Sequence, residues 1–182
     1  DVSVRVQSIS AANAWSKAGL MVRQDLTAGS KNVYVCITPT AGNGASIQYR
    51  STSGGGTTFI NTGSITAPYY VRLTRTGNLF TAQYSAGGSS WTTISTYTLA
   101  MTDPVNFGLA VTSHISGTLC TAVFTDLTGL PTQSFKDTVK VGKDSIQLIY
   151  MINKLGLDVF SMSADAFKPR GSTNLRNYET YL

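Results

Sequence analysis

Carboxylate side chains decide first whether this sequence could hydrolyse a sugar bond, because glycoside hydrolysis requires two of them beside the bond. The first 130 residues contain no glutamate, and their aspartates are widely separated: Asp1, Asp25, Asp103 and Asp126. Asp103 precedes a proline and Asp25 lies beside a loop sequence, which are settings where aspartate caps turns. The acidic residues therefore predict no catalytic pair, and we interpret the chain as a protein that is not an enzyme.

The single histidine, His114, is the next candidate for catalysis, since it follows a serine directly. No Gly-x-Ser-x-Gly sequence surrounds a serine in this chain. A lone histidine rarely acts without oriented partners. We therefore expect His114 to hydrogen-bond a loop at a strand end.

The two cysteines, Cys36 and Cys120, each lie in an apolar, strand-like sequence (VYVCIT and TLCTAVF). They could form a disulfide if their strands pack together in an oxidising compartment. They could equally be two buried thiols, since free cysteine is often buried. Two separated cysteines and one histidine do not predict a zinc site.

Arginine, glutamine and aromatic side chains suggest a different chemistry, the binding of sugars. Aromatic faces contact sugar C–H groups, and polar groups bond the hydroxyls. Strand alternation places several such residues opposite the apolar residues of their strands, where neighbouring strands would gather them into one strip. The predicted ligand-binding residues are Arg23, Gln48, Arg50, Tyr70, Arg72 and Trp91, with Tyr34 and Tyr84 as further members. The alternative is an ordinary solvated sheet face, with both tryptophans in the core.

The elements that must position these side chains are β-strands. Residues 70–74 alternate between polar and apolar, Gly77 and Asn78 favour a turn, and residues 79–84 return as a partner strand. Similar strand and turn signals recur along the chain at short spacing, and charged residues make up only 13%. The pattern predicts an all-β domain, an antiparallel β-sandwich.

Charge and hydropathy exclude some partners. The net charge of +5 is dispersed along the chain, so no basic run predicts a nucleic-acid groove. No apolar run is long enough to predict membrane insertion. The chain begins at Asp1 with no signal peptide, and we expect it to be a processed chain or part of a longer polypeptide.

Five motifs in order resemble the concanavalin A-like lectin/glucanase superfamily, and most of all its bacterial laminin-G-like jelly-roll modules. They are W-S-K-A-G-L-M-V-R, S-K-N-V-Y-V…N-G-A-S-I-Q-Y-R, A-P-Y-Y-V-R-L-T-R-T-G-N-L-F-T-A-Q-Y-S, S-S-W-T and N-F-G-L-A-V-T-S-H. The resemblance covers residues 1–130 and implies a jelly-roll sandwich there. The E-x-D-x-x-E motif of the glucanases is absent. Laminin-G-like relatives often bind calcium, but the scattered Asp25, Asn43 and Asp103 do not predict a site.

Residues 131–182 carry no such resemblance and are expected to form a short mixed α/β C-terminal extension or arm, or the start of another domain. Strands are predicted over residues 138–141 and 157–162, a helix over 146–155 and a turn over 166–171. The apolar part of this segment packs either on the sandwich or on a neighbouring chain, and the sequence leaves both open.

These features favour a non-catalytic carbohydrate-binding or adhesion module of a larger extracellular, secreted or virion protein, with no cofactor. Its expected partner is a glycan or cell-surface polysaccharide. The alternative is a structural module of a large assembly, such as a phage capsid decoration, fibre or tail protein, which contacts neighbouring subunits or flanking domains. A glycoside hydrolase is the least favoured class.

Overall fold

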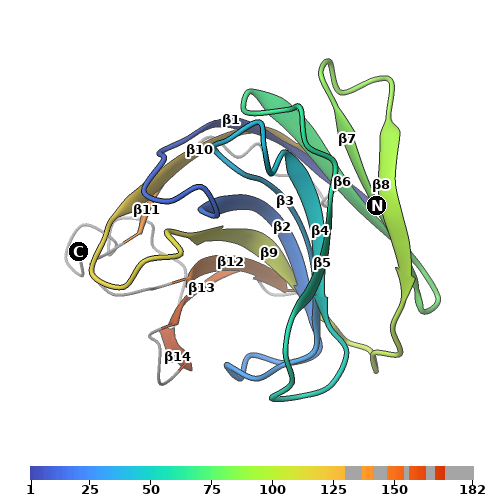
Figure 1. Ribbon diagram of the computed structural model, residues 1–182. Coiled ribbons are helices and arrows are strands. Elements are labelled where there is room, and N and C mark those ends of the chain that lie inside the picture. Colours follow the sequence, from blue (N-terminus) through green and yellow to red (C-terminus); the bar gives the residue numbers. More distant parts are fainter. Residues whose placement is uncertain (130–136, 142–146, 154–155, 163–166, 171–182) are drawn as a thin grey trace.

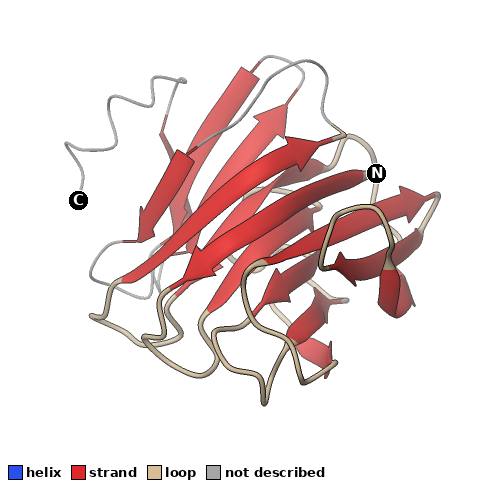
Figure 2. Ribbon diagram, turned by 90° about the horizontal axis from the view of Figure 1, so that it is seen from above, coloured by secondary structure: helices blue, strands red, loops and turns tan. Residues whose placement is uncertain are grey.

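The computed structural model describes residues 1–129 in full and, beyond them, the backbone of four strands within residues 137–170. The described residues form strands and turns and contain no helix (Figure 2). The all-β prediction is therefore confirmed for this part of the chain. No membrane-spanning helix was found in the described residues.

The strands form two antiparallel sheets (Figure 1). The six-stranded sheet has the order β11 (Asp137–Val141), β10 (Cys120–Thr128), β1 (Val2–Ile9), β6 (Tyr69–Thr76), β7 (Leu79–Ser85) and β8 (Thr92–Thr98). The eight-stranded sheet has the order β14 (Phe167–Arg170), β13 (Gly156–Met162), β12 (Gln147–Asn153), β9 (Asn106–Thr112), β2 (Lys17–Arg23), β3 (Asn32–Ile37), β4 (Ala45–Arg50) and β5 (Thr58–Asn61). Residues 1–129 contribute five strands to each sheet.

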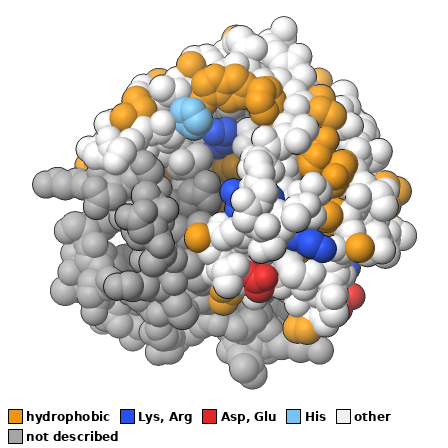
Figure 3. Space-filling view, turned by 60° about the horizontal axis from the view of Figure 1, so that its bottom comes forward, with side chains coloured by type: hydrophobic (Ala, Val, Ile, Leu, Met, Phe, Trp, Pro, Cys, Tyr) orange, Lys and Arg blue, Asp and Glu red, His pale blue; other side chains and the backbone are white. Residues whose placement is uncertain are grey.

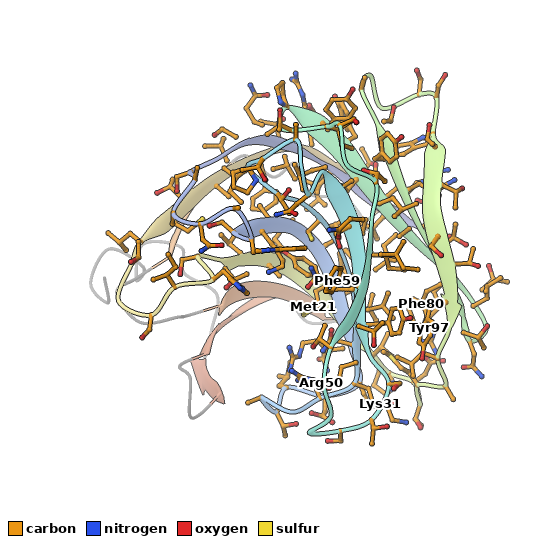
Figure 4. All side chains as sticks on the ribbon, in the orientation of Figure 1. Met21, Lys31, Arg50, Phe59, Phe80 and Tyr97 are labelled. Atoms are coloured by element: carbon orange, nitrogen blue, oxygen red, sulfur yellow. The ribbon has the colours of Figure 1, made fainter. Side chains whose placement is uncertain are left out.

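The hydrophobic core lies between the two sheets. Alternate residues of each strand point into it, such as Leu20 in β2 and Val71 in β6, both fully buried. Phe80 and Phe124 are the largest apolar side chains that are fully buried there. At one edge Tyr49 of β4 stacks on Tyr97 of β8, with ring centroids 3.5 Å apart. Figure 4 shows Phe80 and Tyr97 in this layer.

The hairpin predicted around Gly77 is confirmed. Strand β6 pairs with β7 from Tyr70 opposite Ser85 to Thr76 opposite Leu79. Gly77 joins the two strands with a φ of 58°, a conformation that glycine adopts without steric cost.

The eight-stranded sheet is bent into an arch (Figure 1). One face of the arch packs on the core. The opposite face, called the concave face from here on, turns away from the six-stranded sheet. Every second residue of β2, from Lys17 to Arg23, lies on it, because the alternate residues Ala18, Leu20 and Val22 belong to the core.

The helix predicted over residues 146–155 is wrong for the part that the structure describes. Residues 147–153 form β12, which pairs with β9 on one side and β13 on the other. The run from Leu148 to Ile152 is apolar throughout, and such a run is compatible with a helix or a strand. The N–H and C=O groups along the edge of β9 pair with those of residues 148–152, and this pairing favours the strand over the helix. Residues 146 and 154–155 lie outside the described residues.

The other predictions for residues 131–182 have mixed outcomes. The strands expected near residues 138–141 and 157–162 are confirmed as β11 and β13. The turn expected over 166–171 is wrong for residues 167–170, which form β14 and pair with β13. The described part of this segment therefore consists of strands and not of mixed α/β structure, and these strands continue both sheets.

Candidate functional site

The six predicted ligand-binding residues lie on two different faces of the sandwich. Arg23, Gln48 and Arg50 belong to β2 and β4 and lie on the concave face. By contrast, Tyr70, Arg72 and Trp91 lie on the outer face of the six-stranded sheet, since Val71 and Leu73 of β6 point into the core. The single strip predicted from the sequence is therefore divided by the hydrophobic core. Of the two further tyrosines, Tyr34 lies on the concave face and Tyr84 packs against the core.

Strand register arranges the concave face in rows. In one row Met21 pairs with Tyr34, Tyr34 with Gln48, and Gln48 with Phe59 of β5. In the next row Arg23 pairs with Asn32, which pairs with Arg50. Paired residues point to the same side of a sheet, so each row is a line of neighbouring side chains across the strands.

The floor of the concave face is apolar. Met21, Tyr34, Cys36 and Ala110 form a small buried cluster, against which Leu26 and Ala28 of the β2–β3 loop pack. The Tyr34 hydroxyl donates a hydrogen bond of 2.9 Å to the Ala110 carbonyl oxygen, and so reaches from β3 across β2 to β9. Burial raises the pKa of Tyr34 well above its ordinary value, so the phenol keeps the proton that it donates.

Two arginines meet at one end of this face. The Arg23 side chain is fully buried, and its Nη2 donates to the carbonyl oxygens of Thr27 at 2.5 Å and Ala28 at 3.4 Å. Arg50 is half-buried, and its Nη1 donates to the same Ala28 carbonyl oxygen at 2.8 Å. The Arg50 Nε is buried and has no hydrogen-bond partner among the described residues. The two guanidinium groups thus share one backbone acceptor.

The electrostatics of Arg23 reflect this crowding. Burial and then the positive charge of Arg50 lower its pKa to about 10, while the nearby Asp25 acts in the opposite direction. Arg23 is still a cation at neutral pH. The one ion pair among the described residues is Arg75–Asp103 on the other sheet, so neither Arg23 nor Arg50 is neutralised by direct contact with a described carboxylate.

A third cation, Lys17, lies on the same face at the opposite end of β2. Its Nζ donates to the Trp15 carbonyl oxygen at 2.7 Å and lies 3.5 Å from the His114 Nδ1. Burial lowers the pKa of Lys17, and burial together with the charge of Lys17 lowers that of His114. His114 lies in the β9–β10 loop, where its backbone N–H donates to the Thr112 hydroxyl at 3.2 Å. The loop role of the His114 side chain stays a prediction.

Aromatic rings form a rim beside Lys17. The Trp15 ring meets the Phe59 ring edge to face, with centroids 5.1 Å apart. Phe59 is 51% exposed, which is unusual for so large an apolar side chain. Figure 4 shows Met21, Phe59 and Arg50 on the concave side of the sheet.

Sequence reasoning missed Trp15, Lys17 and Phe59 as site residues. Lys17 carried a usable signal, because it lies six positions before Arg23 and so shares its face of β2. Phe59 follows a Gly-rich, Thr-rich stretch, where the short β5 strand left no clear alternation.

The outer face of the six-stranded sheet holds a different arrangement. The Arg72 Nε donates to the Gln83 Oε1 at 2.7 Å and a second nitrogen of Arg72 donates to the same oxygen. The Arg72 guanidinium carbon also lies 4.4 Å from the centre of the Trp91 ring. These side chains therefore bond one another, and Arg72 lies over one face of the half-buried Trp91 ring.

The rest of that face follows the same pattern. The Tyr70 hydroxyl donates to the Asp126 Oδ2 at 3.1 Å. The Arg5 guanidinium, whose Nε lacks a described partner, lies 5.7 Å from the centre of the Tyr70 ring. Tyr70 is thus held by a carboxylate and an arginine of its own sheet.

The described side chains of the two faces form no metal site and no reactive thiol site. No group of three metal-binding side chains was found within the part of the chain that the structure describes. Cys36 and Cys120 are both free and buried, so the pairing that the sequence left open does not occur here. Cys36 lies in the floor of the concave face and Cys120 in the core, and burial raises the pKa of both, to about 12 for Cys36. Such thiols are unreactive.

Comparisons of this chain with protein-family models, curated proteins and solved structures found no match. Its function is therefore inferred from the side chains on the concave face and on the outer face of the six-stranded sheet.

Proposed function

We propose that this chain is a non-catalytic carbohydrate-binding or adhesion module whose glycan lies on the concave face of the eight-stranded sheet. One observation carries the proposal: the exposed ring of Phe59, the half-buried ring of Trp15 and several polar side chains gather on a single hollowed surface. Figure 3 shows a recess on this side of the molecule, with Lys or Arg side chains along its described wall.

The chemistry of this surface suits a sugar. Sugars present apolar C–H faces and polar hydroxyl groups together, and aromatic side chains supply flat surfaces for the first. Phe59 and Trp15 are such surfaces, and Gln48, in the same row as Phe59, supplies an amide that both donates and accepts. A concave site also removes more of the ligand from water than a flat one does.

The topology supports a concanavalin A-like jelly roll as the scaffold. The chain crosses between the sheets from β1 to β2, from β5 to β6 and from β8 to β9, so strands distant in sequence become neighbours. This agrees with the resemblance of residues 1–130 to that superfamily. The described strands after residue 131 extend both sheets, since β11 pairs with β10 and β12 pairs with β9.

The positions of the described carboxylates support a binding role without catalysis. Asp25 is the aspartate of residues 1–129 that lies near the concave arginines, while Asp103 bonds Arg75 and Asp126 bonds Tyr70. Hydrolysis of a glycosidic bond needs a pair of carboxylates about the bond. The described residues of the concave face offer no such pair.

The second role predicted from the sequence, a structural module of a virion or other large assembly, remains a prediction. It drew on the apolar segment after residue 131. The described strands of that segment pair with the chain's own β9 and β10, so they give this role no separate support.

Binding to a glycan array, with variants on each face, tests the proposal. We expect the full chain to bind a subset of glycans, and Phe59→Ala to weaken binding about fivefold, because a lost aromatic contact is worth about 1 kcal/mol. Arg72→Ala, on the outer face, is the matched control and should leave binding unchanged. Thermal melting of each variant checks that the fold is retained. Absence of binding to every glycan, or a loss with Arg72→Ala alone, would overturn the proposal.

A further inference from the structure

We propose that the glycan bound on the concave face is acidic, an extended oligosaccharide whose carboxylate or sulfate group binds the guanidinium of Arg50 beside Arg23. The inference rests on the proposed function and names the class of its ligand. It follows from the charges on this face, from the groups that those charges contact, and from their spacing.

Among residues 1–129, the charged side chains on the concave face have one predominant sign. Lys17, Arg23 and Arg50 all lie on it, and none forms an ion pair with a described residue. Asp25 is the nearest described carboxylate, and its Oδ1 accepts hydrogen bonds from the Thr27 backbone N–H and hydroxyl. A surface of this sign attracts anions and repels cations.

The contacts of the two arginines leave their charges unbalanced. Arg23 bonds backbone carbonyl oxygens, which satisfy its N–H groups and carry no net charge. Arg50 adds a second positive charge within range of Arg23, which the lowered pKa of Arg23 reflects. Holding two like charges together away from water is unfavourable. An anion bound to Arg50 on the concave face would reduce that repulsion.

The N–H groups of Arg50 that lack a described partner also indicate that the anion binds at Arg50. Arg50 uses Nη1 for the Ala28 carbonyl oxygen, and its buried Nε has no described partner. A guanidinium presents its N–H groups in a planar fork that matches the two oxygens of a carboxylate or sulfate. Arg23 is too deeply buried to contact the ligand directly, and its positive charge attracts the anion through space. Arg50 is therefore the contact residue and Arg23 the supporting charge.

The spacing of the cations indicates an extended ligand. Lys17 and Arg23 lie six residues apart along β2, or roughly 20 Å at about 3.4 Å per residue. The apolar floor around Met21 and Tyr34 lies between them, and the Trp15–Phe59 rim flanks the Lys17 end. A chain of several sugars reaches from one cationic end to the other, whereas a single sugar reaches one.

Titration of the full chain with matched oligosaccharides tests the inference. The probes are an oligouronate, a sulfated oligosaccharide, the carboxyl-reduced form of the same oligouronate, and a single-stranded oligonucleotide of similar length. We expect at least tenfold tighter binding of one acidic glycan than of the neutral form, and affinity that falls as salt rises. Arg50→Gln should abolish this preference, and Arg72→Gln on the outer face should retain it.

A second variant separates the effect of charge on binding from any effect on folding. Gln48→Glu is nearly isosteric, lies two residues from Arg50 on the same face, and introduces a negative charge there. It should weaken binding of the acidic glycan more than binding of the carboxyl-reduced form, since the added charge repels only the acidic ligand. Both variants are first compared with the wild type by thermal melting.

The outcomes separate the inference from the proposed function. Equal binding of the acidic and neutral glycans, still lost with Phe59→Ala, overturns the inference and leaves the proposed function standing. Absence of binding to all glycans overturns both. Tighter binding of the oligonucleotide than of either acidic glycan also overturns the inference. An acidic preference that survives Arg50→Gln and Gln48→Glu overturns the assignment of the anion to Arg50.

Discussion

On the outer face of the six-stranded sheet, Arg72 donates two hydrogen bonds to Gln83 and covers the ring of Trp91. On the concave face of the other sheet, Arg23 and Arg50 donate to backbone carbonyl oxygens and leave one buried nitrogen without a described partner. The two faces carry the same types of side chain. On the outer face Arg72 and Gln83 bond each other, although the buried Nε of Arg5 there also lacks a described partner. On the concave face Arg23 and Arg50 bond backbone carbonyl oxygens and meet no described carboxylate.

The difference has a structural cause. On the six-stranded sheet Arg72 and Gln83 are directly paired across β6 and β7, so their side chains meet. On the concave face Asn32 separates Arg23 from Arg50, and the β2–β3 loop supplies carbonyl oxygens to both. A surface whose polar groups bond one another has little to offer a ligand. A surface with unbalanced charge and open rings retains that capacity.

The largest effect on stability is expected at Gly19, in the floor of the concave face. A Cβ there would collide with the Val35 carbonyl oxygen and lie 2.6 Å from the Cys36 Cα, both in the backbone of the neighbouring strand. Because a paired strand cannot move aside, Gly19→Ala should lower the free energy of unfolding by about 3 kcal/mol in urea denaturation. Gly87→Ala is the control in the β7–β8 turn, where no heavy atom lies within 4 Å. Equal losses for both variants would contradict the close approach at Gly19.

A smaller effect distinguishes the arginines of the two faces. Arg23→Met removes the donor to the Thr27 carbonyl oxygen inside the protein, and we expect a loss of about 2 kcal/mol. Arg72→Met removes contacts that water can replace on the outer face, and we expect a loss of under about 1 kcal/mol. Urea denaturation of both variants measures the difference. A larger loss for Arg72→Met would show that the contacts of Arg72 with Gln83 and Trp91 contribute more to stability than those of Arg23.

The smallest effect on stability is expected at Asp25, the carboxylate near Arg23 and Arg50. Burial raises its pKa, but hydrogen bonds from Thr27 and Ser30 and the charge of Arg23 outweigh burial, and the pKa ends below its ordinary value. A lowered pKa contributes stability above the unfolded-state pKa of about 3.9, and that stability is lost as pH falls through the folded-state value.

Asp25→Asn keeps the acceptor oxygen and removes the charge, so it isolates this contribution. We expect the variant to be less stable than the wild type at pH 7 by under about 1 kcal/mol, since solvent screens the carboxylate. The difference should vanish near pH 2. Urea denaturation at both pH values measures it, and a difference that persists at low pH would assign the effect to the hydrogen bonds instead.

Local pattern predicted much of the fold and less of the site. The hairpin around Gly77 could be predicted because its alternation and turn residues are contiguous in the sequence. The concave members Arg23, Gln48 and Arg50 were also found, since alternation shows which residues lie opposite the core. Alternation does not show to which sheet a strand belongs, so whether Tyr70 and Arg72 would lie beside them depended on strand order, and the structure places both on the other sheet. The apolar run in residues 147–153 was assigned to a helix because its strand partner, β9, lies far away in the sequence.

The sequence by itself determined that the chain would build sheets and that residues 1–130 would bring few carboxylates to any site, because alternation and composition are local or global properties of the chain. Only the tertiary structure decided which arginines share a surface, which ring is covered and which is open, and that Lys17, Trp15 and Phe59 lie on the same side as Arg50. Those outcomes depend on strand order and register. Strand order and register are set by packing and backbone pairing between residues far apart in the sequence.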